Sequence, residues 1–211
     1  MNRVLEIGAY VIASAVALGG GFVGAEMLFN KDETPAGAEV ATERAAAPAD
    51  TAEIRNGRYG FSFRYPKDWS TGPRYHTSVK ESVGRRDGVF CYVSVLEKTF
   101  ASDATGKPKD LRRLMSGLTA DKLEGTPIPG VTTKVDSFGK ATLGGQDARG
   151  FVLDAKGAVG ATLRQGKLYG HATLRSYGAV FLVCVAPEDR HAEADVQAAF
   201  RLAHATFRFS E

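Results

Sequence analysis

The amino-acid sequence predicts an α+β fold, in which an antiparallel β-sheet packs against helices and one hydrophobic helix precedes the folded part. Three observations support this prediction. Four strand-like segments separated by glycine-rich junctions occupy the second half of the chain. Two segments place apolar residues at helical spacing. Near the N-terminus, about 19 consecutive residues are uncharged and mostly apolar.

Residues 1–29 are predicted to be a transmembrane anchor or a signal peptide. The uncharged stretch runs from Ile7 to Ala25, close to the roughly 20 residues that cross a bilayer as a helix. Arg3 precedes it, and Glu26, Lys31, Asp32 and Glu33 follow it, so the positive-inside rule places the N-terminus in the cytoplasm. An anchored chain would be a single-pass protein of the bacterial inner membrane with its C-terminal domain outside the cytoplasm.

A cleaved signal peptide is the alternative for the same segment. Val23-Gly24-Ala25 offers the small residues that a signal peptidase requires, and cleavage would leave a secreted or periplasmic protein. Both alternatives export the domain. Residues 30–50 are rich in alanine and proline and contain no aromatic residue, which predicts a flexible linker. The folded domain is expected over residues 51–211.

The folded domain begins with an alternating aromatic segment and a hairpin. Phe61, Phe63 and Tyr65 alternate with polar residues, which predicts a strand with one face toward a core and with Trp69 beneath it. Residues 84–88 have turn composition and separate two further strands, at 79–83 and 89–96.

Two amphipathic helices and an antiparallel meander complete the expected elements. The helices are expected between residues 110 and 124 and around residues 196–203, with apolar stripes at Leu111, Leu114, Met115 and Leu118, and at Val196, Ala199, Phe200 and Ala203. The meander is expected from segments 131–143, 146–155, 161–177 and 179–186. Both helices would pack against one sheet.

The two ends of the folded domain resemble a known family. Residues 59–69 read Tyr-Gly-Phe-Ser-Phe-Arg-Tyr-Pro-Lys-Asp-Trp, which resembles the opening YGFSFxYPxxW of PsbP-like and DcrB-like domains, and residues 181–187 and 205–209 resemble their closing strand and terminus. The resemblance implies an α/β/α-type sandwich around an antiparallel sheet, used by extracytoplasmic accessory proteins as a binding module rather than as an enzyme. No metal ligands of the family are matched.

Two cysteines, Cys91 and Cys184, lie in predicted central strands of an exported chain. A disulfide between them would close a loop of about 93 residues and stabilise the fold by roughly 4 to 5 kcal/mol on the chain-entropy model. Two buried free thiols are the alternative, because sequence spacing does not show whether the two residues meet.

Motifs for catalysis, cofactors and nucleic acid are missing from the sequence. It has no HExxH or CxxC pattern, no GxSxG or SxxK motif and no phosphate-binding loop in the folded region, so no catalytic residue, metal or cofactor is predicted. The four histidines (His76, His171, His191 and His204) are expected as isolated surface residues. The net charge of +3, from 27 basic and 24 acidic residues spread along the chain, argues against a nucleic-acid partner.

One predicted strand carries the best candidate for a binding surface. Its alternating polar face contains Gln165, Lys167, Tyr169, His171, Thr173, Arg175 and Tyr177, while Leu168, Ala172 and Leu174 take the other side. Lys167, Tyr169, His171, Arg175 and Tyr177 are the predicted ligand or partner residues, suited to an acidic or aromatic ligand. The alternative is an ordinary polar sheet face, which a helix can cover.

The sequence therefore favours a noncatalytic, membrane-tethered envelope domain that binds a protein partner or a small ligand. Two alternatives stay open. One is an envelope hydrolase that pairs His171 with Asp147 or Asp154, although these carboxylates and Asp136 are expected at solvated sheet edges. The other is a structural subunit of a membrane complex, with the N-terminal helix as its docking element.

Overall fold

The structure is a computed structural model that describes residues 50–72, 79–97, 115, 117–128, 131–159 and 162–210. The expected N-terminal hydrophobic helix, residues 30–49 of the linker and His76 lie outside the described residues. Within the described ranges, no helix has the length and apolar character needed to cross a membrane.

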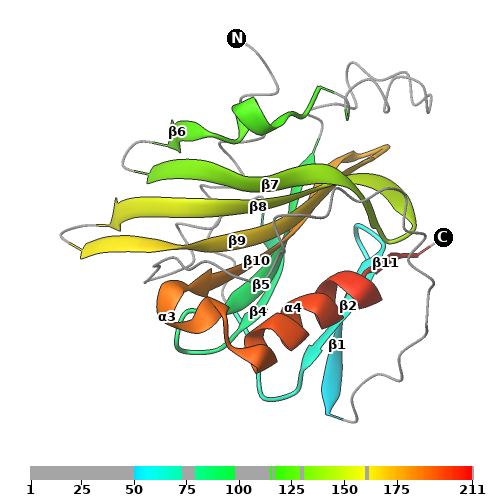
Figure 1. The fold of residues 1–211 in the computed structure, drawn as a ribbon. Coiled ribbons are helices and arrows are strands. Elements are labelled where there is room, and N and C mark those ends of the chain that lie inside the picture. Colours follow the sequence, from blue (N-terminus) through cyan, green and yellow to red (C-terminus); the bar gives the residue numbers. More distant parts are fainter. Residues whose placement is uncertain are drawn as a thin grey trace.

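The described chain forms two antiparallel sheets with few helices (Figure 1). The small sheet has the order β1-β2-β11, with β1 (Thr51–Asn56), β2 (Phe61–Pro66) and β11 (Arg208–Phe209). The large sheet has the order β3-β4-β5-β10-β9-β8-β7-β6, with β3 (Ser70–Thr71), β4 (Val79–Gly84), β5 (Phe90–Glu97), β6 (Gly125–Ile128), β7 (Val131–Leu143), β8 (Gln146–Val159), β9 (Thr162–Arg175) and β10 (Gly178–Pro187). The described helices are a 3-10 turn, η1 (Ala120–Lys122), and two α-helices, α3 (Glu188–His191) and α4 (Ala194–Thr206). The mainly antiparallel α+β prediction is confirmed, but two sheets replace the single sheet expected.

The predicted hairpin and meander are confirmed, with one correction at the end of β9. This strand stops at Arg175, which pairs with Gly178, so Tyr177 lies in a two-residue turn and not on the strand as predicted. β10 begins directly after this turn, at Gly178. A Cβ atom at this position would lie only 2.1 Å from the Leu96 carbonyl oxygen. Only glycine fits this close approach of β10 to β5.

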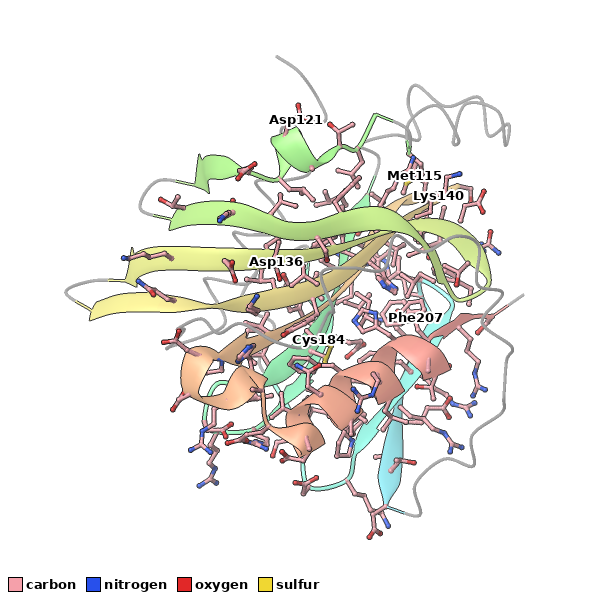
Figure 2. The ribbon with its side chains drawn as sticks, in the orientation of Figure 1. Met115, Asp121, Asp136, Lys140, Cys184 and Phe207 are labelled. Atoms are coloured by element: carbon pink, nitrogen blue, oxygen red, sulfur yellow. A yellow bond between two sulfur atoms is a disulfide. The ribbon has the colours of Figure 1, made fainter. Side chains whose placement is uncertain are left out.

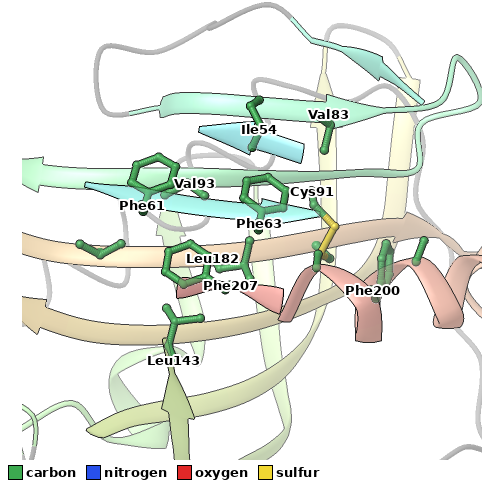
Figure 3. Close-up of a cluster of buried hydrophobic side chains, with 14 of the residues drawn as sticks. Ile54, Phe61, Phe63, Val83, Cys91, Val93, Leu143, Leu182, Phe200 and Phe207 are labelled. Atoms are coloured by element: carbon green, nitrogen blue, oxygen red, sulfur yellow. A yellow bond between two sulfur atoms is a disulfide. The ribbon is translucent and has the colours of Figure 1, made fainter. Parts of the chain in front are cut away.

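A central cluster of buried apolar side chains joins the small sheet, α4 and one face of the large sheet (Figure 3). Among its members are Ile54, Phe61, Phe63, Trp69, Val83, Cys91, Val93, Leu143, Leu182, Cys184, Val196, Ala199, Phe200, Ala203 and Phe207. The predicted inward faces of the aromatic strand and of the C-terminal helix are therefore confirmed.

An arginine fixes the start of α4, since Arg85 contacts Glu193 at 3.1 Å and Asp195 at 2.7 Å.

Cys91 and Cys184 form a disulfide inside this central cluster. The two residues are directly opposite each other in the register of β5 and β10, and both are fully buried. Of the two alternatives that the sequence left open, the structure contains the disulfide.

The helix predicted between residues 110 and 124 is wrong at its C-terminal end. Residues 110–114 lie outside the described ranges, but Thr119 has an extended backbone and only the short turn η1 follows it. Leu118 and Leu123, on either side of this turn, are both buried against the second face of the large sheet. Thr133 Oγ1 also donates a hydrogen bond to the Leu123 carbonyl at 2.7 Å. This hydrogen bond and the burial of both leucines stabilise the short turn in place of a continuous helix.

Candidate functional site

The predicted alternation along β9 is present in the structure. Leu168, Ala172 and Leu174 lie in the apolar cluster on the second face of the large sheet, whereas Tyr169 packs against the central cluster on the first face. The polar side of β9 is therefore on the sheet face that α4 covers, and much of it lies beneath that helix.

Tyr169 is the main contact between β9 and α4. Its ring lies 5.4 Å from the ring of Phe200, and its hydroxyl oxygen accepts a hydrogen bond from Gln197 Nε2 at 3.3 Å. Burial raises the pKa of Tyr169. Thr173 is buried nearby and donates a hydrogen bond to the Asp147 carbonyl at 2.6 Å. The two Tyr169 contacts hold the helix on the sheet, and the Thr173 hydrogen bond joins β9 to β8.

His171 and His204 meet at the same interface. Their ring centroids are 4.4 Å apart in an edge-to-face arrangement. Burial lowers the pKa of His171, and burial together with the neighbouring His171 lowers the pKa of His204 to about 3. His191 is buried as well, in α3. The expectation of isolated surface histidines is therefore wrong for these three, because the helices cover them.

Lys167 forms a charged cluster with two aspartates of the large sheet, Asp136 in β7 and Asp154 in β8. Its Nζ lies 2.9 Å from Asp136 Oδ2 and 3.2 Å from Asp154 Oδ1, which join β7, β8 and β9. Burial alone would lower the pKa of Lys167, but the hydrogen bond to Asp136 and the charge of Asp154 outweigh it and raise that pKa. The Lys167 side chain is 11% exposed, against 44% and 43% for the two aspartates.

Arg175 and Tyr177 lie apart from this charged cluster. The Arg175 guanidinium stacks over the ring of Phe209 at 4.4 Å from its centroid. Tyr177 donates a hydrogen bond to the Tyr59 carbonyl oxygen at 2.8 Å, and the two rings are 5.6 Å apart. Of the five predicted site residues, Lys167, Tyr169 and His171 follow one another along β9, whereas Arg175 contacts β11 and Tyr177 contacts the turn between β1 and β2.

The hydrolase pairing considered from the sequence is not formed among the described residues. Asp154 is paired with Lys167, four positions before His171, a separation of roughly 13 Å along a strand. Asp147 precedes Ala148, which points into the central cluster, so the Asp147 side chain lies on the other face from His171. In the part of the chain that the structure describes, no group of three or more histidine, cysteine or acidic residues is placed to hold a metal ion.

Sequence reasoning placed Asp136 and Asp154 at solvated edges and missed their contact with Lys167. A signal for half of this cluster was present, because pairing the end of β8 at Val159 with the start of β9 at Thr162 puts Asp154 opposite Lys167. Asp136 joins through a register shift of β7 between Val135 and Ser137. This β-bulge directs an extra side chain toward Lys167.

The fold and its site describe an antiparallel α+β domain with a helix-covered sheet face and a mixed-charge cluster on its long strands. No protein-family model matches the sequence, and a comparison with curated proteins finds no significant match.

Three solved structures are similar to the chain. Cyanobacterial PsbP (CyanoP) of Synechocystis has 14% identity and a TM-score of 0.46, and the match covers 82% of this chain and 99% of that chain. A Bacteroides thetaiotaomicron protein has 14% identity and a TM-score of 0.48, with 75% of this chain matching 48% of that chain, about half its length. LpqN, involved in cell envelope biogenesis of Mycobacterium tuberculosis, has 17% identity and a TM-score of 0.42, with coverage of 77% and 91%. One of these three structures is a PsbP protein, and the PsbP-like domains are the family that residues 59–69 resemble.

Proposed function

We propose that the protein is a noncatalytic accessory domain of the bacterial cell envelope, tethered to the inner membrane by residues 1–29. Two observations support an extracytoplasmic domain. The hydrophobic stretch lies before the domain, in the orientation that exports the C-terminal part of a chain. The Cys91–Cys184 disulfide is of a kind that persists in oxidising compartments and is rare in the cytosol.

The charged cluster of Asp136, Asp154 and Lys167 is the observation on which the binding role rests. Its ammonium group is buried beneath two carboxylates that are each nearly half exposed, so a ligand meets negative charge first. Asp136, Asp154 and Lys167 together carry a net charge of −1, and the exposed Lys134 of β7 pairs with Asp154 beside them. The two exposed carboxylates suit a cationic group, such as a lysine or arginine side chain of a partner protein, better than the acidic ligand expected from the sequence.

The tether is tested by the intact mass of the protein recovered from bacterial membranes. A full-length mass in the membrane fraction is expected. Loss of residues 1–25, with recovery in the soluble fraction, would make the protein a secreted binding domain instead. Gentle solubilisation in the same experiment separates a free tethered domain from a subunit that copurifies with a membrane complex.

The binding role is tested with the full-length protein in detergent and an arginine dipeptide as a probe in calorimetric titration. Asp136→Asn should weaken binding, while leaving Asp154 to neutralise Lys167. Asp121→Asn removes an exposed carboxylate in η1 and serves as the matched control. Equal affinities for the two variants would exclude this cluster as the binding site.

A further inference from the structure

The outer face of the small sheet carries three arginines, and we call it the arginine face. Strand register defines it, since Glu53 pairs with Arg64, and Ser62 pairs with Arg55 on one side and with Arg208 on the other. Directly paired residues point to the same side of a sheet. The opposite side carries Ile54, Phe61 and Phe63 of the central cluster, so the arginine face points away from the core.

A single carboxylate beneath the arginines fixes two of them in place. Glu53 accepts hydrogen bonds from Arg55 Nε at 2.8 Å and from Arg55 Nη2 at 2.6 Å, and it also accepts one from Arg208. Arg208 Nε donates to Ser62 Oγ at 3.0 Å. The hydrogen bond from Arg55 is the main cause that lowers the pKa of Glu53, so this acid stays ionised at neutral pH.

The surface that results is positively charged. The Glu53 side chain is 19% exposed, whereas those of Arg55 and Arg208 are 74% and 61% exposed. Arg64 forms no ion pair within the described ranges, which leaves the face with a net charge of +2. Guanidinium groups present a planar set of donors that matches phosphate oxygens, and their partial fixation lowers the entropy lost on binding.

The position of the arginine face relative to the linker indicates the partner. β1 begins at Thr51, directly after the linker of residues 30–50, and β11 at the other end of the chain belongs to the same sheet. The sequence predicts that this linker is flexible, and a flexible chain of about 20 residues has a mean end-to-end distance of roughly 25 Å. The arginine face therefore stays close to the bilayer, and a weak interaction is sufficient because the tether keeps the local concentration high.

We propose that the arginine face docks on anionic phospholipid headgroups and thereby orients the domain on the membrane. This inference rests on the tether of the proposed function. In Figure 1 the small sheet lies at the right, whereas β7, β8 and β9 extend to the left. Nitrogen-tipped side chains project outward beside the small sheet in Figure 2. Docking through the arginine face leaves the ends of those long strands open to a partner.

The test uses full-length protein in nanodiscs of phosphatidylcholine alone or with phosphatidylglycerol, each containing a lipid with a dansyl-labelled headgroup. Trp69 is the only tryptophan and lies buried three residues after β2, so quenching of its fluorescence by energy transfer to dansyl reports how close the small sheet is to the headgroups. Stronger quenching with phosphatidylglycerol, reduced by salt, is expected. Arg55→Gln with Arg208→Gln should remove this difference.

A control pair removes the same charge elsewhere. Arg86→Gln with Lys140→Gln replaces two exposed basic residues outside the small sheet and should leave the lipid-dependent quenching intact. Thermal denaturation of both double variants verifies that they fold. Equal quenching in the two lipids, or quenching kept in the arginine variant, would refute docking on lipid. Salt-sensitive quenching without lipid dependence would point to an acidic protein or polymer instead.

The failure of this inference is distinguishable from failure of the tether. Intact mass and flotation with the nanodiscs establish insertion first, so an inserted protein without lipid-dependent quenching refutes only the arginine face. If the native protein lacks residues 1–25, the processed form is floated with vesicles of the same two compositions. Its association with phosphatidylglycerol should then fall roughly fivefold for each arginine removed, and unchanged flotation would overturn the proposal.

Discussion

The contact between His171 and His204 makes the stability of the domain depend on pH. Both pKa values are lowered in the folded state, so the unfolded chain binds protons below about pH 6.5 that the folded chain does not bind. Their contribution to stability is thus complete above about pH 6.5 and is lost as the pH falls below it. The loss continues toward the folded pKa of His204, which is about 3.

We expect the free energy of unfolding to fall by up to about 1.4 kcal/mol per pH unit between pH 6 and 5 because of His204, and His171 adds to this fall in the same direction. His204→Leu should reduce that slope by about one histidine's share, because leucine has no proton to bind. Urea denaturation at several pH values from 7 to 5 measures it. This window lies above the range in which Glu97, with a pKa of about 2 in the folded state, changes the stability. Identical slopes for the variant and the wild type would show that His204 is not buried as a neutral group.

Two glycines of the large sheet, in β9 and β7, provide a matched test of packing. Gly170 is directly opposite Phe151, and a Cβ atom there would lie 2.2 Å from ring carbons of that phenylalanine. At Gly139 no atom lies within 4 Å of an added Cβ. Gly170→Ala should therefore lower the unfolding free energy by about 1 to 3 kcal/mol, while Gly139→Ala should change it by less than about 0.5 kcal/mol. Chemical denaturation compares the two, and similar values would contradict the close ring contact.

At the scale of elements, the disulfide fixes the register of β5 against β10. It closes a loop with a sequence separation of 93 residues. Replacing Cys91 and Cys184 by alanine should destabilise the domain by about 2 to 5 kcal/mol. Thermal denaturation with and without reductant is the measurement. The reductant should lower the melting temperature of the wild type but not that of the double variant, and a wild type insensitive to reductant after full reduction would contradict the expected stabilisation.

Most strands were predictable because their signals are local. Alternating aromatic residues predicted β2, and glycine junctions predicted the meander from β7 to β10. β11 was not assigned as a strand, since Arg208 and Phe209 are extended only through pairing with β2 across the molecule. The helix prediction near residue 118 is wrong for a related reason. Burial of Leu118 and Leu123 against the sheet stabilises the chain more than a continuous helix would, because Gly117 and Thr119 have low helix propensity.

The candidate site shows where sequence reasoning stops. Period two along β9 placed Lys167, Tyr169 and His171 on one face, as the structure has them, because the side-chain direction follows from the strand alone. The contact of His171 with His204 depends on where α4 packs, and the contact of Lys167 with Asp136 depends on a bulge. Neither is encoded in a local pattern.

At the scale of the whole molecule, Phe207 connects the two sheets and α4. It is buried in the central cluster, directly after α4 and before β11, and its ring stacks 5.8 Å from Phe61 and 6.3 Å from Phe63. Because this cluster takes residues from both sheets, neither sheet keeps a complete core when the other is lost. The domain should therefore unfold in one transition.

Phe207→Ala should destabilise the whole domain by about 3 to 5 kcal/mol, the usual cost of removing a buried phenylalanine ring. Hydrogen exchange measures the unfolding free energy at the slowest amides of β2 in the small sheet and of β10 in the large sheet. An equal loss of protection is expected in both strands. Phe209→Ala, at a half-exposed ring of the same strand region, is the control and should cost less. If only β2 lost protection, the small sheet would be a separate folding unit, and the arginine face would then be carried by a part of the molecule that opens on its own.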